Sequence, residues 1–103
     1  VIIEDQEGKA MDVKLEKRLR RAARALKKAG ANEVYVFGSA AEENLSAESD
    51  IDLAVSGLPP SVFFRAMGRA SDALGLPVDL VDLDEDNRFV SYLKEKGKLL
   101  RVV

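Results

Sequence analysis

The sequence predicts one α/β (α+β) domain, residues 1–103, in which a single mixed β-sheet is flanked by helices. Three observations favour this class. The chain has 103 residues, the length of one domain. Apolar residues make up 47% and charged residues 33% of it, as in globular proteins. Segments of helical and of strand periodicity alternate along the chain, an order that produces a sheet with helices packed on it.

The first expected element is a basic helix that ends before Gly30, a residue suited to the position after a helix. Its apolar residues recur at helical spacing, at Met11, Leu15, Leu19, Ala22, Ala23, Leu26 and Ala29. Between residues 14 and 28, eight basic residues accompany one acidic residue, Glu16. These cations either solvate the outer faces of the helix or contact RNA or an acidic partner.

Two short strands follow, EVYVF over 33–37 and IDLAV over 51–55, because β-branched and aromatic residues are typical of strands. The small and polar residues 38–50 between them are expected to form a loop or a short helix. The sequence SGLPP then predicts a turn, since proline cannot donate to a β-ladder.

The second half of the chain repeats this alternation. We expect a helix from Ser61 to Gly75, a strand over 76–83, a helix that ends at Gly97 and a last strand over 99–103. The acidic triplet Asp84-Glu85-Asp86 is expected to supply the N-cap of the helix that precedes Gly97.

Four aromatic residues in these helices are expected in the core or at an interface rather than in a functional role: Phe63, Phe64, Phe89 and Tyr92. The adjacent rings of Phe63 and Phe64 cannot both be buried on one helical stripe. One of them is therefore expected to be available to a partner or to a second copy of the chain, so that the protein forms a homo- or hetero-oligomer.

Three aspartates are the candidate catalytic and metal-binding residues. Asp50 and Asp52 are two positions apart at the start of a strand, so their carboxylates project to the same face, with Cα atoms about 6.6 Å apart. Such a pair repels itself unless it takes up a proton or a cation. Asp79, within the apolar run VDLVDL, completes a cluster if its strand is a neighbour, and is preferred to Asp82 because an unpaired carboxylate among apolar residues is costly.

Gly38 and Ser39 are the candidate phosphate-binding residues. They directly follow the strand over 33–37. Glycine lets the backbone approach an anion closely and serine adds a hydroxyl donor. A phosphate cradle, a metal pair and a candidate base together are the equipment for moving a nucleotidyl or phosphoryl group.

The absent residue types narrow the chemistry further. The chain contains no cysteine and no histidine, which excludes disulfides, thiolate nucleophiles and the common zinc sites. A general base must then be a carboxylate, lysine or tyrosine. A metal must be held by oxygen ligands, which favour magnesium, manganese or calcium.

These motifs resemble the nucleotidyltransferase superfamily related to DNA polymerase β, and the short length resembles its minimal nucleotidyltransferases. The residues that carry the resemblance are VYVFGSAAEENLSAESDIDLAV with VDLVDL downstream, and it extends from about residue 12 to the end of the chain. It implies the nucleotidyltransferase fold. It also implies that a hydroxyl attacks the α-phosphorus of ATP and that pyrophosphate leaves.

The resemblance further implies roles for individual residues. Gly38 and Ser39 would bind the β- and γ-phosphates of a nucleoside triphosphate, and Asp50 and Asp52 would bind Mg²⁺ or Mn²⁺. Asp79 would help to bind the metal and activate the attacking hydroxyl. Many minimal members are antitoxins encoded beside a helical ribonuclease toxin of the HEPN type, which they neutralise by binding it or by transferring AMP to one of its tyrosines.

One departure from the family pattern leaves two functions open. Family members often carry an arginine soon after Gly-Ser, whereas this chain reads GSAAEE. Positive charge for the triphosphate would then come from the first helix, from Arg65 or Arg69, or from a partner chain. The alternative is a non-catalytic binding module that neutralises its partner by complex formation.

The sequence also gives expectations for the cellular location and for nucleic-acid binding. No apolar run approaches the length of about 20 residues that spans a bilayer, and no stretch shows the order of a signal peptide. We therefore expect a cytoplasmic protein without a membrane partner. Direct nucleic-acid binding is not expected, because aromatic residues are few and none accompanies the basic helix.

Overall fold

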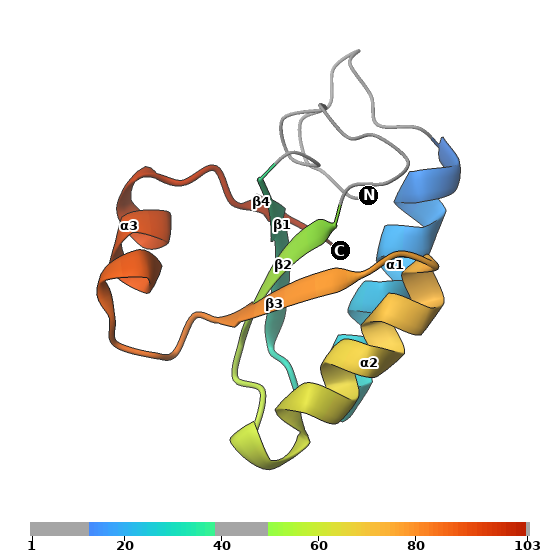
Figure 1. Cartoon of the computed structure of the whole chain (residues 1–103), viewed down its shortest axis with the longest axis horizontal. Helices are drawn as coiled ribbons and strands as arrows, with labels where there is room; N and C mark the ends of the chain where they lie inside the picture. Colours follow the sequence, from blue (N-terminus) through green and yellow to red (C-terminus); the bar gives the residue numbers. More distant parts are fainter. Residues whose placement is uncertain (1–12, 39–49, 103) are drawn as a thin grey trace.

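A computed structural model of the chain describes residues 13–38 and 50–102. In these residues a four-stranded sheet has two helices packed on one face and one helix on the other (Figure 1). The expected α/β class and the mixed sheet are confirmed. Met11 and residues 39–49, which include Ser39, lie outside the described residues.

The order of elements also agrees with the sequence prediction. The described elements are α1 (Val13–Ala29), β1 (Glu33–Phe37), β2 (Ile51–Ser56), a 3₁₀ turn (Pro60–Val62), α2 (Phe63–Leu74), β3 (Val78–Asp82), α3 (Arg88–Lys96) and β4 (Leu100–Arg101).

The sheet has the strand order β3-β2-β1-β4. β1 pairs antiparallel with both β2 and β4, whereas β2 pairs parallel with β3. A parallel pair needs a long crossover, and α2 provides it between β2 and β3. β3 is consequently an edge strand, open on the side that does not face β2.

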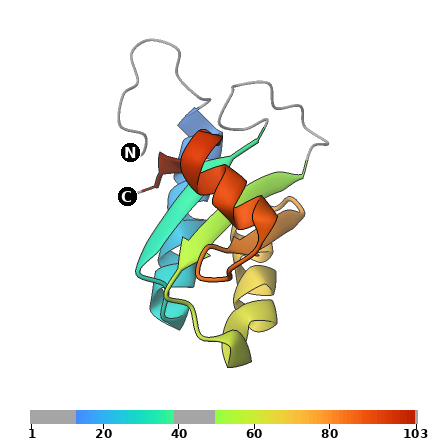
Figure 2. The same ribbon diagram turned by 90° about the vertical axis from the view of Figure 1, so that its left-hand side faces the viewer.

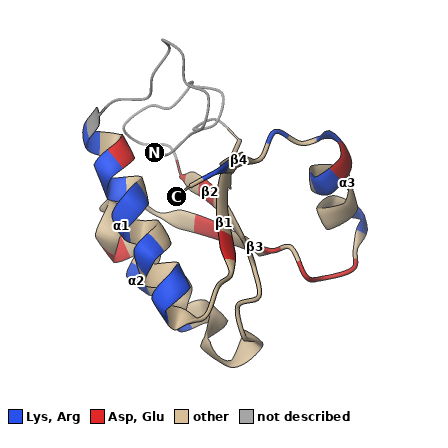
Figure 3. Ribbon diagram, turned by 180° about the vertical axis from the view of Figure 1, so that it is seen from behind, with Lys and Arg blue, Asp and Glu red and all other residues tan. Residues whose placement is uncertain are grey.

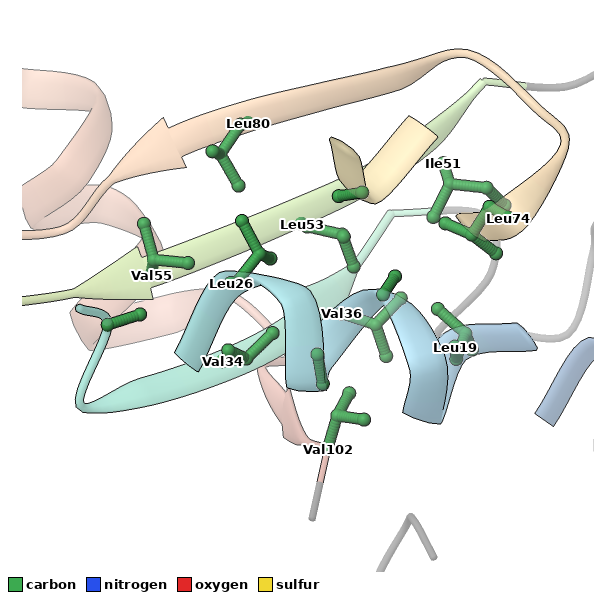
Figure 4. Packing of buried hydrophobic residues seen from close by; sticks show 14 of the residues in the cluster. Leu19, Leu26, Val34, Val36, Ile51, Leu53, Val55, Leu74, Leu80 and Val102 are labelled. Carbon is green, nitrogen blue, oxygen red and sulfur yellow. The ribbon is translucent and has the colours of Figure 1, made fainter. Parts of the chain in front are cut away.

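The main core lies between the sheet and the pair α1 and α2 (Figure 4). Because side chains alternate along a strand, Ile51, Leu53 and Val55 of β2 all point to these helices. They are fully buried against leucines such as Leu19 and Leu26 of α1. The next residues in the alternation, which include Asp52, therefore point to the opposite face.

Figure 2 shows α3 in front of that opposite face. A smaller cluster of buried residues lies between α3 and the sheet. Its buried members are Ala54, Leu83, Val90 and Leu93. The cluster is short because α3 has nine residues, so α3 covers only part of the sheet.

The N-cap of α3 is not in the acidic triplet, so that expectation is wrong. Asn87 caps the helix, and its side chain accepts a hydrogen bond of 2.9 Å from the backbone N–H of Val90. Asp84 instead accepts from the backbone N–H of Gly57 at 2.6 Å. The carboxylate at position 84 is used to join two turns rather than to start the helix.

The aromatic residues divide between partly buried and exposed sites. Phe63 packs against the main core, whereas Phe64 is 76% exposed. The expectation that one ring of this pair stays available is confirmed. On α3, however, Phe89 and Tyr92 are 51% and 58% exposed. Of the two placements expected for them, the core is excluded, and an interface stays a prediction.

Within the described parts of the chain, no helix has both the length and the apolar character needed to cross a bilayer.

Candidate functional site

Asp52 and Asp79 lie side by side on neighbouring strands. Their Cα atoms are partners in the parallel register of β2 and β3, where strands are about 4.8 Å apart. Both residues are on the face opposite α1 and α2, because the next pair in register, Leu53 and Leu80, belongs to the main core. The sheet topology therefore brings together two aspartates that are distant in sequence.

The carboxylate of Asp52 is in an unfavourable setting. Burial raises the pKa of Asp52 above its ordinary value, and the negative charges of Asp79 and Asp50 raise this pKa further. None of the described residues forms a hydrogen bond or an ion pair with its side chain. A cation bound here would relieve both the repulsion and the burial penalty.

Asp50 precedes β2 directly and is exposed, as is Asp79 on the edge strand. The negative charge of Asp50 contributes to the raised pKa of Asp52. Over residues 13–38 and 50–102, however, no group of three acidic side chains is arranged so that it could hold one metal ion. The structure thus presents Asp52 and Asp79 as a pair, with Asp50 beside them at the start of β2.

Gly38 approaches the carboxylate of Asp52 from the end of β1. It follows Phe37, whose Cα partner in the antiparallel register is Asp52. Its φ is +71°, and a Cβ atom on this residue would collide with Oδ2 of Asp52. Only glycine satisfies both conditions. The end of β1 is therefore built around the position of Asp52, and the Ser39 that follows lies outside the described residues.

Asp82 is separated from this site. It is half-buried at the far end of β3, and its Oδ1 atom accepts a hydrogen bond of 2.9 Å from the backbone N–H of Asp84. The preference for Asp79 agrees with the register, but the reason given for it is wrong. Asp79 is the more exposed of the two, because β3 has no neighbouring strand on its outer side within residues 13–38 and 50–102.

An aromatic wall beside the site was not anticipated from the sequence. Phe37 lies directly opposite Asp52, where side chains on the same face are neighbours, and its ring is 6.3 Å from that of Phe89 on α3. The ring of Phe37 is therefore on the face of the sheet that carries Asp52 and is adjacent to Phe89 of α3. The signal was available in the strand alternation, which places Phe37 on the face of Asp52 once the register is known.

The basic residues of α1 and α2 lie on the other side of the sheet. Arg65 and Arg69 of α2 line a groove together with Arg24 and Lys28 of α1. The sheet separates this groove from Asp52. Of the sources of positive charge left open by the sequence, these four side chains are therefore not placed to bind a triphosphate at the aspartates.

The donor set fits a magnesium-type ion. Its candidate ligands are carboxylate oxygens only, which Mg²⁺ and Mn²⁺ prefer. Burial and the negative charges of Asp79 and Asp50 raise the pKa of Asp52, and a bound cation would offset the repulsion among these carboxylates.

Comparison with known protein families identifies a related family. The family described as polymerase beta, nucleotidyltransferase matches residues 21–101, a span that contains Gly38 and the three candidate aspartates. None of the curated protein sequences compared with the chain matches it.

Several solved structures are similar. A chain of a toxin–antitoxin complex with AMP-PNP is 26% identical, with a TM-score of 0.65 over 82% of this chain and 70% of that chain. A candidate minimal nucleotidyltransferase is 27% identical, with a TM-score of 0.65 over 88% and 98%. A chain in the complex of tri-AMPylated Shewanella oneidensis HEPN toxin with MNT antitoxin is 23% identical, with a TM-score of 0.61 over 82% and 70%, a likeness of fold alone.

Proposed function

The chain belongs to the polymerase beta nucleotidyltransferase family, and we propose that it is an antitoxin that transfers AMP from ATP to a hydroxyl group of a HEPN-type toxin. The acceptor in this proposal is a tyrosine of the toxin. The observation that carries the proposal is the register of Asp52 and Asp79, which pairs two carboxylates next to the close backbone approach of Gly38.

Each residue of the site has a distinct role in this reaction. Asp50, Asp52 and Asp79 would hold Mg²⁺ or Mn²⁺, and the Gly38-Ser39 segment would bind the β- and γ-phosphates through backbone N–H groups and the serine hydroxyl. The metal, when bound, supplies positive charge that stabilises the triphosphate and the leaving pyrophosphate. Phe37 is opposite Asp52 in the register, and its ring would limit the access of water to the carboxylate, which strengthens electrostatic interactions there.

The transfer needs one proton acceptor. The hydroxyl oxygen of the acceptor forms a bond to the α-phosphorus of ATP, the bond from that phosphorus to the β-phosphate oxygen breaks, and pyrophosphate leaves. The hydroxyl proton passes to a carboxylate, for which Asp79 is the candidate. Asp79 is exposed at the sheet edge, so a hydroxyl carried by another protein can approach it.

The similar structures support the partner class and the nucleotide. A toxin–antitoxin complex with AMP-PNP contains a chain that shares 26% identity with this one. AMP-PNP is an ATP analogue, which supports ATP as the substrate.

A second candidate function is a binding module that neutralises its partner without catalysis. The sequence GSAAEE after β1 favours it, because Glu42 and Glu43 would repel a triphosphate where relatives often carry an arginine. In this case the fold would be retained and the partner would be inhibited by occlusion.

One experiment separates the two functions. The protein is mixed with Mn²⁺ or Mg²⁺, the HEPN-type protein encoded beside it and ATP labelled at the α-phosphate, and the label on the partner is measured. We expect the wild type to label the partner and Asp52→Asn to do so about 10²-fold more slowly, the scale for losing a positioned catalytic group. ATP labelled at the γ-phosphate is the control and should leave the partner unlabelled.

The variant also tests the alternative. If Asp52→Asn and the wild type bind and inhibit the partner equally and neither labels it, the protein is a binding module. Titration of Mn²⁺ into both proteins adds an independent measure. Equal binding of Mn²⁺ would remove Asp52 from the metal site.

A further inference from the structure

A groove between α1 and α2 concentrates positive charge on the side of the sheet away from the aspartates. Its basic side chains are Arg24 and Lys28 of α1 and Arg65 and Arg69 of α2, and we call it the cationic groove. All four are exposed. Figure 3 shows Lys and Arg distributed along both helices, which lie side by side.

None of the four basic side chains forms an ion pair with another of the described residues. The ion pairs there join Arg20 to Glu16 and Arg101 to Glu33, and none includes a residue of the cationic groove. Arg24 and Lys28, like Arg65 and Arg69, are four residues apart on one helix, a spacing at which like charges destabilise the helix by about 0.2–0.5 kcal/mol per pair. Both rows of cations line the same groove, because α1 packs on α2. An anionic occupant would reverse this penalty.

The floor of the groove is apolar. It is formed by Ala25 and Ala29 of α1 with Val62 and Ala66 near and in α2. Small side chains leave room for another segment to approach the helix backbones closely. The groove is thus a shallow apolar channel bordered on each side by a row of cations.

This arrangement fits an amphipathic helix better than a nucleic acid. Residues four apart on a helix rise by about 6 Å, so acidic residues at that spacing on a docked helix match the cations four apart on α1 and α2. Its apolar ridge would lie on the alanine floor. A single-stranded nucleic acid would gain from aromatic rings on which bases stack, and no aromatic residue is among those that line the groove.

We propose that the cationic groove is the docking site for an amphipathic helix of the protein partner whose flanks carry acidic residues. The inference rests on the proposed function for the identity of that partner, a helical toxin. Docking here leaves Asp52 and Asp79 accessible, because the sheet lies between them and the groove. The acceptor hydroxyl of a partner held in this way would come from another of its segments, one that passes the edge strand β3 to reach the exposed Asp79.

The test uses a defined probe. A fluorescent synthetic helical peptide carries alanine and leucine on one face and glutamates four apart along both flanks, and its binding to the intact chain is followed by fluorescence anisotropy at low and high salt. We expect the double substitution Arg65→Gln with Arg69→Gln to weaken binding about tenfold or more, the effect of losing two complementary charges at an interface. High salt should weaken the wild type similarly.

Matched controls distinguish the groove from general charge. Lys94→Gln with Lys96→Gln removes the same charge from two exposed positions of α3, which lies across the sheet, and should leave binding within about twofold. A peptide with glutamine in place of glutamate should not bind. The same two pairs of variants are then compared for co-elution with the HEPN-type partner, where only the groove variant should weaken the complex.

Two results would overturn the proposal. The first is equal binding of the peptide by the groove variant and the wild type. The second is tighter binding of a single-stranded uridine oligonucleotide than of the peptide, which would identify the occupant as a nucleic acid. Failure of the proposed function is separate, because a wild type that binds the peptide but neither labels nor inhibits the partner rejects only the antitoxin role.

Discussion

Asp52 of β2 and Asp79 of β3 are partners in the parallel register of the sheet, with both carboxylates on the face that α3 leaves partly open. The pairing is a direct result of the crossover through α2, which returns the chain beside β2 in the same direction. Two like charges at such a distance destabilise a fold unless a cation joins them. The pair is therefore best explained by function rather than by stability.

The two aspartates of β3 should differ sharply in their effect on AMP transfer. Asp79→Asn should lower the rate about 10²-fold, the usual scale for the loss of a positioned base or ligand. Asp82→Asn should leave the rate within a few-fold, because Asp82 is at the far end of the strand and accepts a backbone hydrogen bond at 2.9 Å that an asparagine oxygen can also accept. Rates are read from the label incorporated into the partner.

Circular dichroism of both variants provides the folding control for this comparison. A larger loss in Asp82→Asn than in Asp79→Asn would mean that the third carboxylate has been assigned to the wrong residue.

Removal of the charge of Asp52 should stabilise the metal-free protein at neutral pH. Burial and the charges of Asp79 and Asp50 raise the pKa of Asp52 above its ordinary value of 3.8, so the ionised form opposes folding. Asp52→Asn should raise the free energy of unfolding by about 1 kcal/mol or less, since the side chain is only half-buried and water screens the repulsion. Urea titration with EDTA present measures the difference, and Asp72→Asn on α2 is the control.

The pH dependence of this gain has a definite sign. Above the raised pKa the carboxylate is charged in both the folded and the unfolded state, and the penalty is complete. As the pH falls through the raised pKa towards 3.8, the folded state takes up the proton first, and the wild type regains stability relative to Asp52→Asn. A gain for the variant that grows at acid pH would contradict this cause.

The start of α3 can be tested in the same way. Asn87→Ala removes the side-chain oxygen that accepts from the N–H of Val90 at 2.9 Å and should lower the free energy of unfolding by about 1 kcal/mol. Asp86→Ala, at the preceding exposed position, should change it by less than about 0.5 kcal/mol. Equal losses in urea titrations would place the cap in the acidic triplet after all.

The sequence predicts the elements well because each has a strong local signal. The leucines and alanines of α1 repeat at helical spacing. The strand over 33–37 is mostly β-branched and aromatic, and the strand over 51–55 is mostly apolar. Gly30 and Gly75, with φ of +129° and +71°, follow the helices that they were expected to end. These features depend on neighbours in sequence, so they can be read without a structure.

Features that depend on tertiary contacts could not be read in this way. Asp84, Asp86 and Asn87 can all cap a helix by their chemistry. The structure shows that Asp84 accepts from Gly57 instead and that Asn87 accepts from the N–H of Val90. The exposure of Asp79 follows from the edge position of its strand, which periodicity does not reveal. The proximity of Phe37 and Phe89 likewise requires the position of α3 over the sheet.

The contact between Gly38 and Asp52 should be measurable as a coupling between the two residues. Gly38→Ala combines a positive φ of +71° with a collision between the new Cβ atom and Oδ2 of Asp52. Gly75 has the same φ of +71° but nothing within 4 Å of its virtual Cβ atom. Gly75→Ala should therefore lower the free energy of unfolding by about 1–2 kcal/mol, the cost of the backbone conformation alone, and Gly38→Ala should lower it by more.

A double-mutant cycle isolates the collision. In an Asp52→Ala background the carboxylate is absent, so the loss caused by Gly38→Ala should fall to about that of Gly75→Ala, whereas Gly75→Ala should cost the same in both backgrounds. Gly38→Ala should also weaken Mn²⁺ binding because it displaces the Asp52 carboxylate, and Gly75→Ala should not. If Gly38→Ala costs the same with and without the carboxylate, the glycine serves the turn after β1 alone, and the end of β1 is not built around Asp52.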